Sequence, residues 1–307
     1  MSFISKSIPL FFLSATWHLS LLAQLPTTLG NISFYDSLEE VKTQIGNDVL
    51  SQTVLALEQP IFPLAKELET HLLCTNLKTA NGTLAQVVFT FADDQLQYIE
   101  ARGGAISTLL DSQQDTLITF MHYLASPENR IFAVPKKDQV WMVSPEAAHC
   151  NLFAWENPYL TANGPAATSY LQSAAIPDFI EMGGEFDRLR PLLEANSSFV
   201  YERKLDGSDP NAQIQLDCFG VEYAGFPRKV EARFGNGKLN TVWILTGKGE
   251  EDRIRQKLQE RYGAPVFTNA DWEIFENWTV GLRKDKPEVL LLTPELGQFY
   301  KTEFFKQ

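Results

Sequence analysis

The chain has 307 residues, of which 44% are hydrophobic and 12% aromatic, a composition typical of folded rather than disordered protein. The 26 Lys and Arg residues are outnumbered by 38 Asp and Glu residues, which gives a formal net charge of −12. Nucleic acids and anionic lipids are bound by clusters of Lys and Arg. This charge balance therefore disfavours both as partners.

Residues 1–23 are typical of a secretory signal peptide. Lys6 is followed by a mostly apolar run, and the small residue Ala23 precedes Gln24 at a plausible cleavage site. A transmembrane anchor is the alternative, but polar residues interrupt a run that would need about 20 apolar residues to cross a bilayer. We therefore expect a secreted or periplasmic protein with no membrane span after cleavage.

The rest of the chain reads as two copies of one pattern. Phe91 and Phe234 lie 143 positions apart, and so do Leu96 and Leu239, each pair within a similar stretch of alternating apolar residues. A repeat of this length predicts two sister domains rather than a solenoid. The predicted organisation is a signal peptide at 1–23, a first α+β domain at 24–156, a linker at 157–177 and a second α+β domain at 178–307.

Each copy is expected to open with an amphipathic helix. In the first copy Ser37 can cap this helix and Glu40 completes a capping box, while Leu38, Val41 and Ile45 form one apolar stripe. The matching stripe of the second copy consists of Phe186, Leu189 and Leu193, with Pro191 as a possible kink.

Three strands are expected to follow this helix in each copy. In the second copy Asn236 and Gly237 predict a tight hairpin between the second and third strands, and Asp93 and Asp94 serve the same turn in the first copy. Apolar residues alternate before both turns. The alternation predicts a sheet with one buried face and one free face.

A second helix and two closing strands complete each predicted copy. The order α-β-β-β-α-β-β indicates two tandem duplicated α+β domains, each an antiparallel sheet with helices on one face. In the first copy the helix stripe is Leu117, Phe120 or Met121, and Leu124, and the strands are 139–143 and 151–155. In the second copy the stripe is Ile254, Leu258 and Tyr262, ending at Gly263, and the strands are 272–282, with a break at 277, and 288–293.

Three cysteines leave the disulfide state open. Cys74 and Cys218 hold equivalent positions, which favours buried thiols, while Cys150 has no counterpart and a Cys74–Cys150 bridge remains an alternative. Whether any glycosylation sequon carries a glycan is also left open. The four sequons begin at Asn31, Asn81, Asn196 and Asn277.

Catalytic motifs are absent from the sequence. It contains no zinc-protease, Cys-X-X-Cys, nucleophile-elbow, P-loop or dinucleotide-binding pattern. His149 and Cys150 would point to opposite faces of a strand, His122 is expected on the surface of the second helix, and the loop at 206–211 lacks the ligands of a calcium loop. We therefore predict no catalytic, cofactor-binding or metal-binding residues, and no cofactor.

Five tryptophans follow the predicted signal peptide. Most should lie in the cores, and some are candidates for an exposed aromatic cluster on a free sheet face, where aromatic residues suit protein or glycan binding. They are Trp141, Trp155, Trp243, Trp272 and Trp278.

The pattern resembles the tandem repeats of secreted β-lactamase-inhibitor-protein-like domains. The residues that carry the resemblance are 33–46 for the opening helix, and 218–223 with 234–239 for the sheet, about half of each copy. The resemblance implies a non-catalytic protein that binds partners through sheet faces or loops. It carries over no functional residue.

Duplication, an export signal and the lack of catalytic motifs together favour a non-enzymatic binding protein. Its partner would be an unknown protein or glycan, bound on a sheet face or between the domains. The main alternative is an exported hydrolase with a carboxylate or histidine site in the inter-domain cleft, where ligand pockets often form. A structural envelope protein is a third possibility.

Cleavage of the predicted signal peptide is directly testable. Mass spectrometry of exported protein should find Gln24, free or cyclised, at or near the new N-terminus. Exported soluble protein that still carries Met1 would contradict a cleaved signal.

Overall fold

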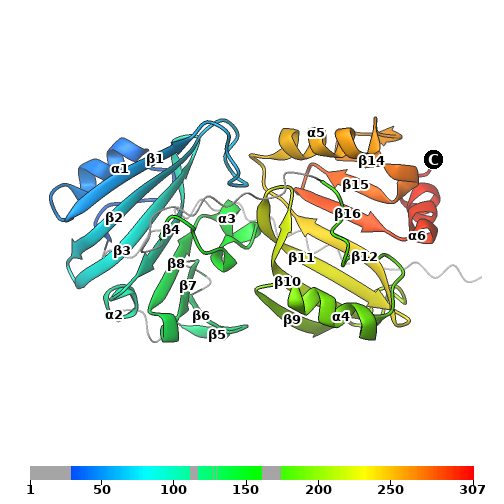
Figure 1. Ribbon diagram of the computed structural model, residues 1–307, viewed down its shortest axis with the longest axis horizontal. Helices are drawn as coiled ribbons and strands as arrows, with labels where there is room; N and C mark the ends of the chain where they lie inside the picture. Colours follow the sequence, from blue (N-terminus) through cyan, green and yellow to red (C-terminus); the bar gives the residue numbers. More distant parts are fainter. Residues whose placement is uncertain (1–28, 111–116, 127, 129, 161–173) are drawn as a thin grey trace, which may run out of the picture.

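Two antiparallel sheets lie side by side in the computed structural model (Figure 1). The structure describes residues 29–110, 117–126, 128, 130–160 and 174–307. The predicted signal peptide and most of the predicted linker lie outside these residues. Within the described residues, no helix is long and apolar enough to cross a membrane.

The first sheet has eight strands in the order β1-β2-β3-β4-β8-β7-β6-β5. Chain neighbours are therefore sheet neighbours except where β4 meets β8 at the centre. The strands are β1 (Ser51–Leu57), β2 (Glu69–Thr79), β3 (Gly82–Ala92), β4 (Gln95–Arg102), β5 (Ile118–Phe120), β6 (Tyr123–Ser126), β7 (Ile131–Val134) and β8 (Gln139–Val143).

The second sheet repeats this topology with eight further strands. Its order, β9-β10-β11-β12-β16-β15-β14-β13, is that of the first sheet, strand for strand. The strands are β9 (Phe199–Lys204), β10 (Ile214–Tyr223), β11 (Phe226–Gly235), β12 (Lys238–Leu245), β13 (Phe267–Thr268), β14 (Trp272–Phe275), β15 (Val280–Arg283) and β16 (Glu288–Leu292).

The central hairpins of the two sheets match in detail. Phe91 pairs with Leu96 just after a bulge in the β3–β4 ladder, and Phe234 pairs with Leu239 just after a bulge in the β11–β12 ladder. All four side chains are buried. The predicted equivalence of these pairs is confirmed, and the shared bulge is consistent with a duplication.

The closing halves of the sheets match at a different spacing. Each strand from β13 to β16 begins 149 positions after its counterpart among β5 to β8. The same spacing relates Ser144 and Thr293, each of which caps a short helix that begins with proline. The residues that account for the larger spacing lie between β12 and β13. The helix there, α5, is longer than α2, its counterpart between β4 and β5.

Helices lie on both faces of each sheet. Val41 of α1 and Leu109 of α2 join one core, whereas Ala147 of α3 packs on the opposite face. In the second sheet Leu193 of α4 and Leu258 of α5 share one core, and α6 lies on the opposite face. The expected single helical face is therefore not confirmed. The helices are α1 (Leu38–Ile45), α2 (Ala105–Leu109), α3 (Pro145–His149), α4 (Phe186–Ala195), α5 (Glu251–Tyr262) and α6 (Pro294–Phe299).

The opening helices form as the sequence predicts. Ser37 and Glu40 make the reciprocal hydrogen bonds of a capping box at α1. Pro191 lies inside α4, where Leu189 and Leu193 still bury their side chains. Gly263, at φ 79°, ends α5 as predicted. At these helices, the residue preferences for capping and the spacing of the apolar residues agree with the packing.

Three predicted elements were wrong. The helix expected over 117–124 is the β5–β6 hairpin, in which Met121 takes a left-handed conformation at φ 56°. The strand expected over 151–155 is a 3₁₀ turn, because Asn151 at φ 58° reverses the chain. Four strands, rather than three, precede the second helix of each copy, and four, rather than two, follow it. The sequence does not indicate the flanking strands β1 and β9 because they lack a regular alternation of buried residues.

Short helical turns complete the described chain. Two of them connect neighbouring strands, one follows α3 and one follows α6 at the C-terminal end. They are the 3₁₀ helices η3 (Pro135–Lys137), η4 (Leu152–Ala154) and η5 (Glu276–Trp278), and the π-helix η6 (Tyr300–Phe304).

All three cysteines are free and buried. Cys74 and Cys218 lie in the cores beneath α1 and α4, whereas Cys150 lies among residues on the opposite face of the first sheet. The alternative of a Cys74–Cys150 bridge is therefore not realised. The two equivalent cysteines act as small buried side chains.

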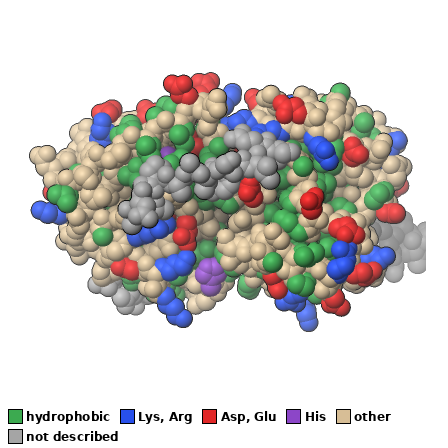
Figure 2. Space-filling model, in the orientation of Figure 1, with side chains coloured by type: hydrophobic (Ala, Val, Ile, Leu, Met, Phe, Trp, Pro, Cys, Tyr) green, Lys and Arg blue, Asp and Glu red, His purple; other side chains and the backbone are tan. Residues whose placement is uncertain are grey.

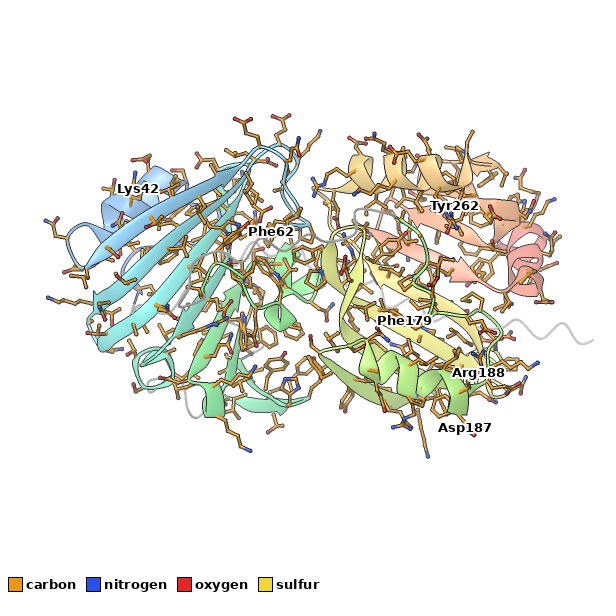
Figure 3. All side chains as sticks on the ribbon, in the orientation of Figure 1. Lys42, Phe62, Phe179, Asp187, Arg188 and Tyr262 are labelled. Atoms are coloured by element: carbon orange, nitrogen blue, oxygen red, sulfur yellow. The ribbon has the colours of Figure 1, made fainter. Side chains whose placement is uncertain are left out.

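The loop between β1 and β2 fastens the two sheets together. Figure 3 shows Phe62 of this loop between the two halves, where it is fully buried. The Gly249 N–H donates to the Pro63 carbonyl oxygen at 3.1 Å. A Cβ on Gly249 would lie 2.1 Å from the Leu64 carbonyl oxygen, so only glycine allows this approach.

Arg253 of the second half completes this contact. The Arg253 guanidinium donates to the carbonyl oxygens of Ala65 at 2.6 Å and Phe62 at 3.2 Å. Beneath it, Arg228 and Glu250 form a two-bond ion pair in which both side chains are at most 2% exposed. Glu250 also accepts from the Gly247 N–H at 2.9 Å. The pair therefore fixes the segment that receives the first sheet's loop.

Replacing Gly249 by alanine should weaken the junction. The added Cβ forces a backbone shift, and we expect a loss of about 1–3 kcal/mol with unfolding split into two calorimetric transitions. The control is Gly263→Ala, which adds a Cβ at a left-handed position with nothing within 4 Å. This control should lower stability but keep one transition. A single transition for Gly249→Ala at wild-type stability would contradict the role of the loop.

Candidate binding groove between the sheets

The face of the first sheet that lies opposite α1 is aromatic. Alternation along the strands places Tyr98 of β4, Trp141 of β8, Tyr123 of β6 and Phe132 of β7 on this one face, and each is buried. The Trp141 and Tyr123 rings meet edge to face at 5.8 Å. This surface forms one wall of the contact between the sheets.

The second sheet supplies the opposite wall from its β9 side. Phe199 and Phe219 stack at 4.3 Å with their ring planes 11° apart. Phe226 lies 5.3 Å from Trp155 and 6.4 Å from Phe62, measured between ring centroids. The aromatic cluster is thus continuous across the two sheets.

Between these walls lies a groove of about 760 Å³. The first sheet contributes residues from its β5–β6 turn, from β7 to β8 and from the segment after α3. The second sheet contributes residues near the junctions of α4 with β9 and of β10 with β11. The lining includes His122, Tyr123, Lys137, Trp141, Asn151, Trp155, Glu156, Ser198, Phe199, Phe219, Glu222 and Lys229.

His122 connects the two walls at the groove. Its ring lies 4.2 Å from Phe199, edge to face, and 4.1 Å from Tyr123. Partial burial and the nearby Lys137 ammonium lower the pKa of His122. The neutral imidazole therefore serves as an aromatic contact between the sheets.

The ionised groups of the groove are paired within the protein. Lys137 and Glu156 form an ion pair at 2.7 Å, and Glu156 lies 3.6 Å from Arg102. On the other wall, Lys229 contacts Glu231 at 2.8 Å and Asp217 at 3.3 Å. The groove thus presents polar atoms without a strong field of one sign.

A buried polar cluster lies behind the first wall. His71 Nε2 lies 2.7 Å from Glu69 Oε1, and His71 Nδ1 lies 3.0 Å from Thr90 Oγ1. These three residues have the composition of a catalytic triad, but each is fully buried. Asn157 donates to Thr90 Oγ1 at 3.1 Å and lies 3.1 Å from the same ring nitrogen. The cluster therefore fixes the chain that leaves the first sheet.

Glu100 also holds the segment around Asn157. It accepts hydrogen bonds from the Asn157 N–H at 2.7 Å, the Tyr98 hydroxyl at 2.8 Å and the Gln139 amide at 2.7 Å. Burial raises the pKa of Glu100, although the Arg102 guanidinium and these hydrogen bonds oppose the rise. A fully hydrogen-bonded carboxyl group of this kind holds a structure in place.

The residues considered from sequence do not form a catalytic site. Burial raises the pKa of the Cys150 thiol to about 12, and its Sγ lies 3.3 Å from the Thr246 carbonyl oxygen. His149 is exposed beside it. The loop at 206–211 is built from Asx turns closed by Asp206 and Asp209. Within the described residues, no group of three potential metal ligands is close enough to hold an ion.

Most tryptophans lie in the cores, as expected, and the alternative of an exposed tryptophan cluster is not realised. Trp141 and Trp155 are buried in the contact between the sheets, and Trp272 is buried in the second sheet. Trp243 and Trp278 are half-buried and pack against the same cluster as the C-terminal residues. The aromatic surface lies instead between the sheets.

Sequence reasoning missed most of the groove. His122 is exposed, as expected, but it lies in the β5–β6 turn rather than on a helix. Phe199 and Glu156 belong to no motif that the sequence offers. The available signal was the aromatic residues on the second copy's edge strand β9 and its neighbour β10. Phe199 and Phe219 occupy the positions of Ser51 and Thr75 in the first sheet, given the matching pairings of β9–β10 and β1–β2.

Comparisons of the chain with protein-family models, with curated proteins and with solved structures found no match.

The junction should loosen in acid. Burial would raise the pKa of Glu69, but His71 and the N–H groups of Phe62 and Ile61 outweigh it and lower that pKa below its ordinary value of 4.5. Likewise, the N–H groups of 66–68 and Arg253 outweigh burial and lower the pKa of Asp93 below 3.8. Both carboxylates therefore stabilise the fold fully above these ordinary values, and the stabilisation is lost as the pH falls through the lowered ones.

The measurement is thermal unfolding between about pH 6 and about pH 2. The variant Glu69→Gln, Asp93→Asn should show a shallower loss of stability with acid than the wild type. Glu58→Gln, in an exposed part of the same loop, is the control and should keep the wild-type slope. An unchanged slope in the double variant would show that other groups control the acid response.

Proposed function

We propose that this protein is an exported, non-enzymatic binding protein that holds an amphipathic ligand in the groove between its two sheets. The observation that carries the proposal is the groove itself, about 760 Å³ in volume and lined by aromatic side chains from both sheets. This volume lies within the range of about 300–1,000 Å³ common for ligand sites. Its position agrees with the inter-domain surface, one of the two binding surfaces that the sequence leaves open.

An oligosaccharide is the ligand class that best fits this lining. Rings such as Phe199 and His122 offer flat apolar surface, while Asn151, Ser198 and Glu222 bring amide, hydroxyl and carboxylate groups to the same groove. Sugars combine apolar ring faces with hydroxyl groups and so need both kinds of contact. On the face that Figure 2 shows, acidic and basic side chains are interspersed, without the basic stripe that nucleic acid requires.

The chemistry of the lining also favours binding over catalysis. The Cys150 thiol is protonated at neutral pH because burial raises its pKa to about 12. The ring of His122 contacts aromatic rings. The resemblance to secreted β-lactamase-inhibitor-protein-like repeats supports the same proposal, since those domains bind partners without turnover.

A hydrolase remains the second candidate for one specific reason. Glu156 from the first half and Glu222 from the second half both line the groove, and two carboxylates across a groove are the groups that glycoside hydrolysis uses. Glu156 forms an ion pair with Lys137 at 2.7 Å.

Ligand binding is tested by calorimetric titration with a panel of oligosaccharides. Phe199→Ala removes a ring from the groove wall and should weaken binding by about 2 kcal/mol, or roughly thirtyfold. Phe299→Ala is the matched control, because Phe299 is an exposed ring on α6 outside the groove. Equal affinities for the two variants, or no binding to any oligosaccharide, would contradict the proposal.

The hydrolase alternative is separated by product analysis after long incubation. Glu156→Gln and Glu222→Gln should leave a binding protein able to bind, and the wild type should release no product. Product release by the wild type that either substitution abolishes, with binding retained, would establish the hydrolase instead.

A further inference from the structure

The four edge strands of the two sheets differ in how they are protected against pairing. β5 has three residues and β13 has two, so each offers little to pair with. β9 has six residues, half of them the charged Glu202, Arg203 and Lys204. β1 has seven residues, Ser-Gln-Thr-Val-Leu-Ala-Leu, with no charge and no proline. Proteins normally protect a long edge with charges, proline or bulges, and β1 has none of these.

The strand β1 is also accessible and regular. It pairs with β2 from Ser51–Thr75 to Leu57–Glu69 without a bulge, and no residue of β1 is buried. Val54 is 42% exposed, and Leu50 just before the strand is 76% exposed. Among the described residues, β2 is the only strand that pairs with β1, which therefore lies at the edge of the sheet (Figure 1).

The duplication provides an internal comparison for this edge. The ladders place Val54 opposite Leu72 and Glu202 opposite Leu216, the same position of the two sheets. By the same comparison, Arg203 of β9 stands where β1 has Leu55. The second copy thus carries two charges at the edge positions where the first copy carries aliphatic residues.

We propose that β1 pairs antiparallel with β1 of a second copy of this chain, about a two-fold axis at Val54. The two first sheets would then form one continuous sheet. An antiparallel pair of strands gives about one backbone hydrogen bond per residue pair, and a two-fold axis lets one surface serve both partners.

The charge pattern favours a second copy as the occupant. A chain of net charge −12 repels its own kind at most surfaces, but β1 is uncharged. In the proposed register Val54 faces Val54 of the partner copy, Leu55 faces Thr53, and Leu57 faces Ser51. The nearest acidic group, Glu58, comes opposite Leu50. No like charges meet, and aliphatic side chains contact one another diagonally across the axis.

Sedimentation velocity over a wide range of protein concentration tests the proposal. The wild type should shift from monomer to dimer as its concentration rises. Val54→Glu and Leu55→Arg, the residues that β9 carries at these positions, should weaken dimerisation at least about tenfold while circular dichroism stays unchanged. Tyr201→Glu on β9 is the control and should dimerise like the wild type.

A single cysteine provides the geometric test. Val54→Cys would face its own copy across the axis and should form an intermolecular disulfide on mild oxidation, whereas Tyr201→Cys should not. A wild type that stays monomeric at every concentration would overturn the proposal. A dimer that Val54→Glu and Leu55→Arg leave intact would overturn it as well.

Discussion

A loop of the first sheet, held at both ends by carboxylates of that sheet and bound by Arg253 of the second half, is the constraint on which the rest of this structure depends. Glu69 accepts hydrogen bonds from the N–H groups of Ile61 and Phe62, both at 2.8 Å. Contacts within the first sheet therefore fix the conformation of the loop. Arg253 of the second half then donates to the carbonyl oxygens of Ala65 and Phe62 in this loop. Buried polar groups are costly when unpaired, so the two sheets are joined in one arrangement. The groove exists because of this arrangement.

The two copies share topology but have diverged where they meet. Their strand order, the bulge in the central hairpin and the helix caps at Ser144 and Thr293 coincide. Phe199 and Phe219 stand where the first copy has Ser51 and Thr75. The second copy thus has aromatic rings at positions where the first copy has polar residues. The two sheets thus differ at their edges, where the inter-sheet groove and the uncharged strand β1 lie.

The sequence predicted the parts of the fold that local signals determine. Short-range residue preferences predict the cap at Ser37, the turns at Asp93 and Asn236, and the end of α5 at Gly263. The structure confirms all of them. The β5–β6 hairpin was missed because apolar residues at helical spacing also fit a tight hairpin once Met121 turns left-handed. The groove could not be predicted, since its walls come from residues far apart in the chain and their meeting depends on how the sheets dock.

Hydrogen exchange at the Gly249 amide tests this account most directly, because that N–H donates across the junction to Pro63. If the sheets form one cooperative unit, this amide should exchange as slowly as the amides of the central strands β3 and β11, through global unfolding alone. Exchange far faster than in both central strands would show that the halves separate while each sheet stays folded. That result would contradict a groove fixed by the junction.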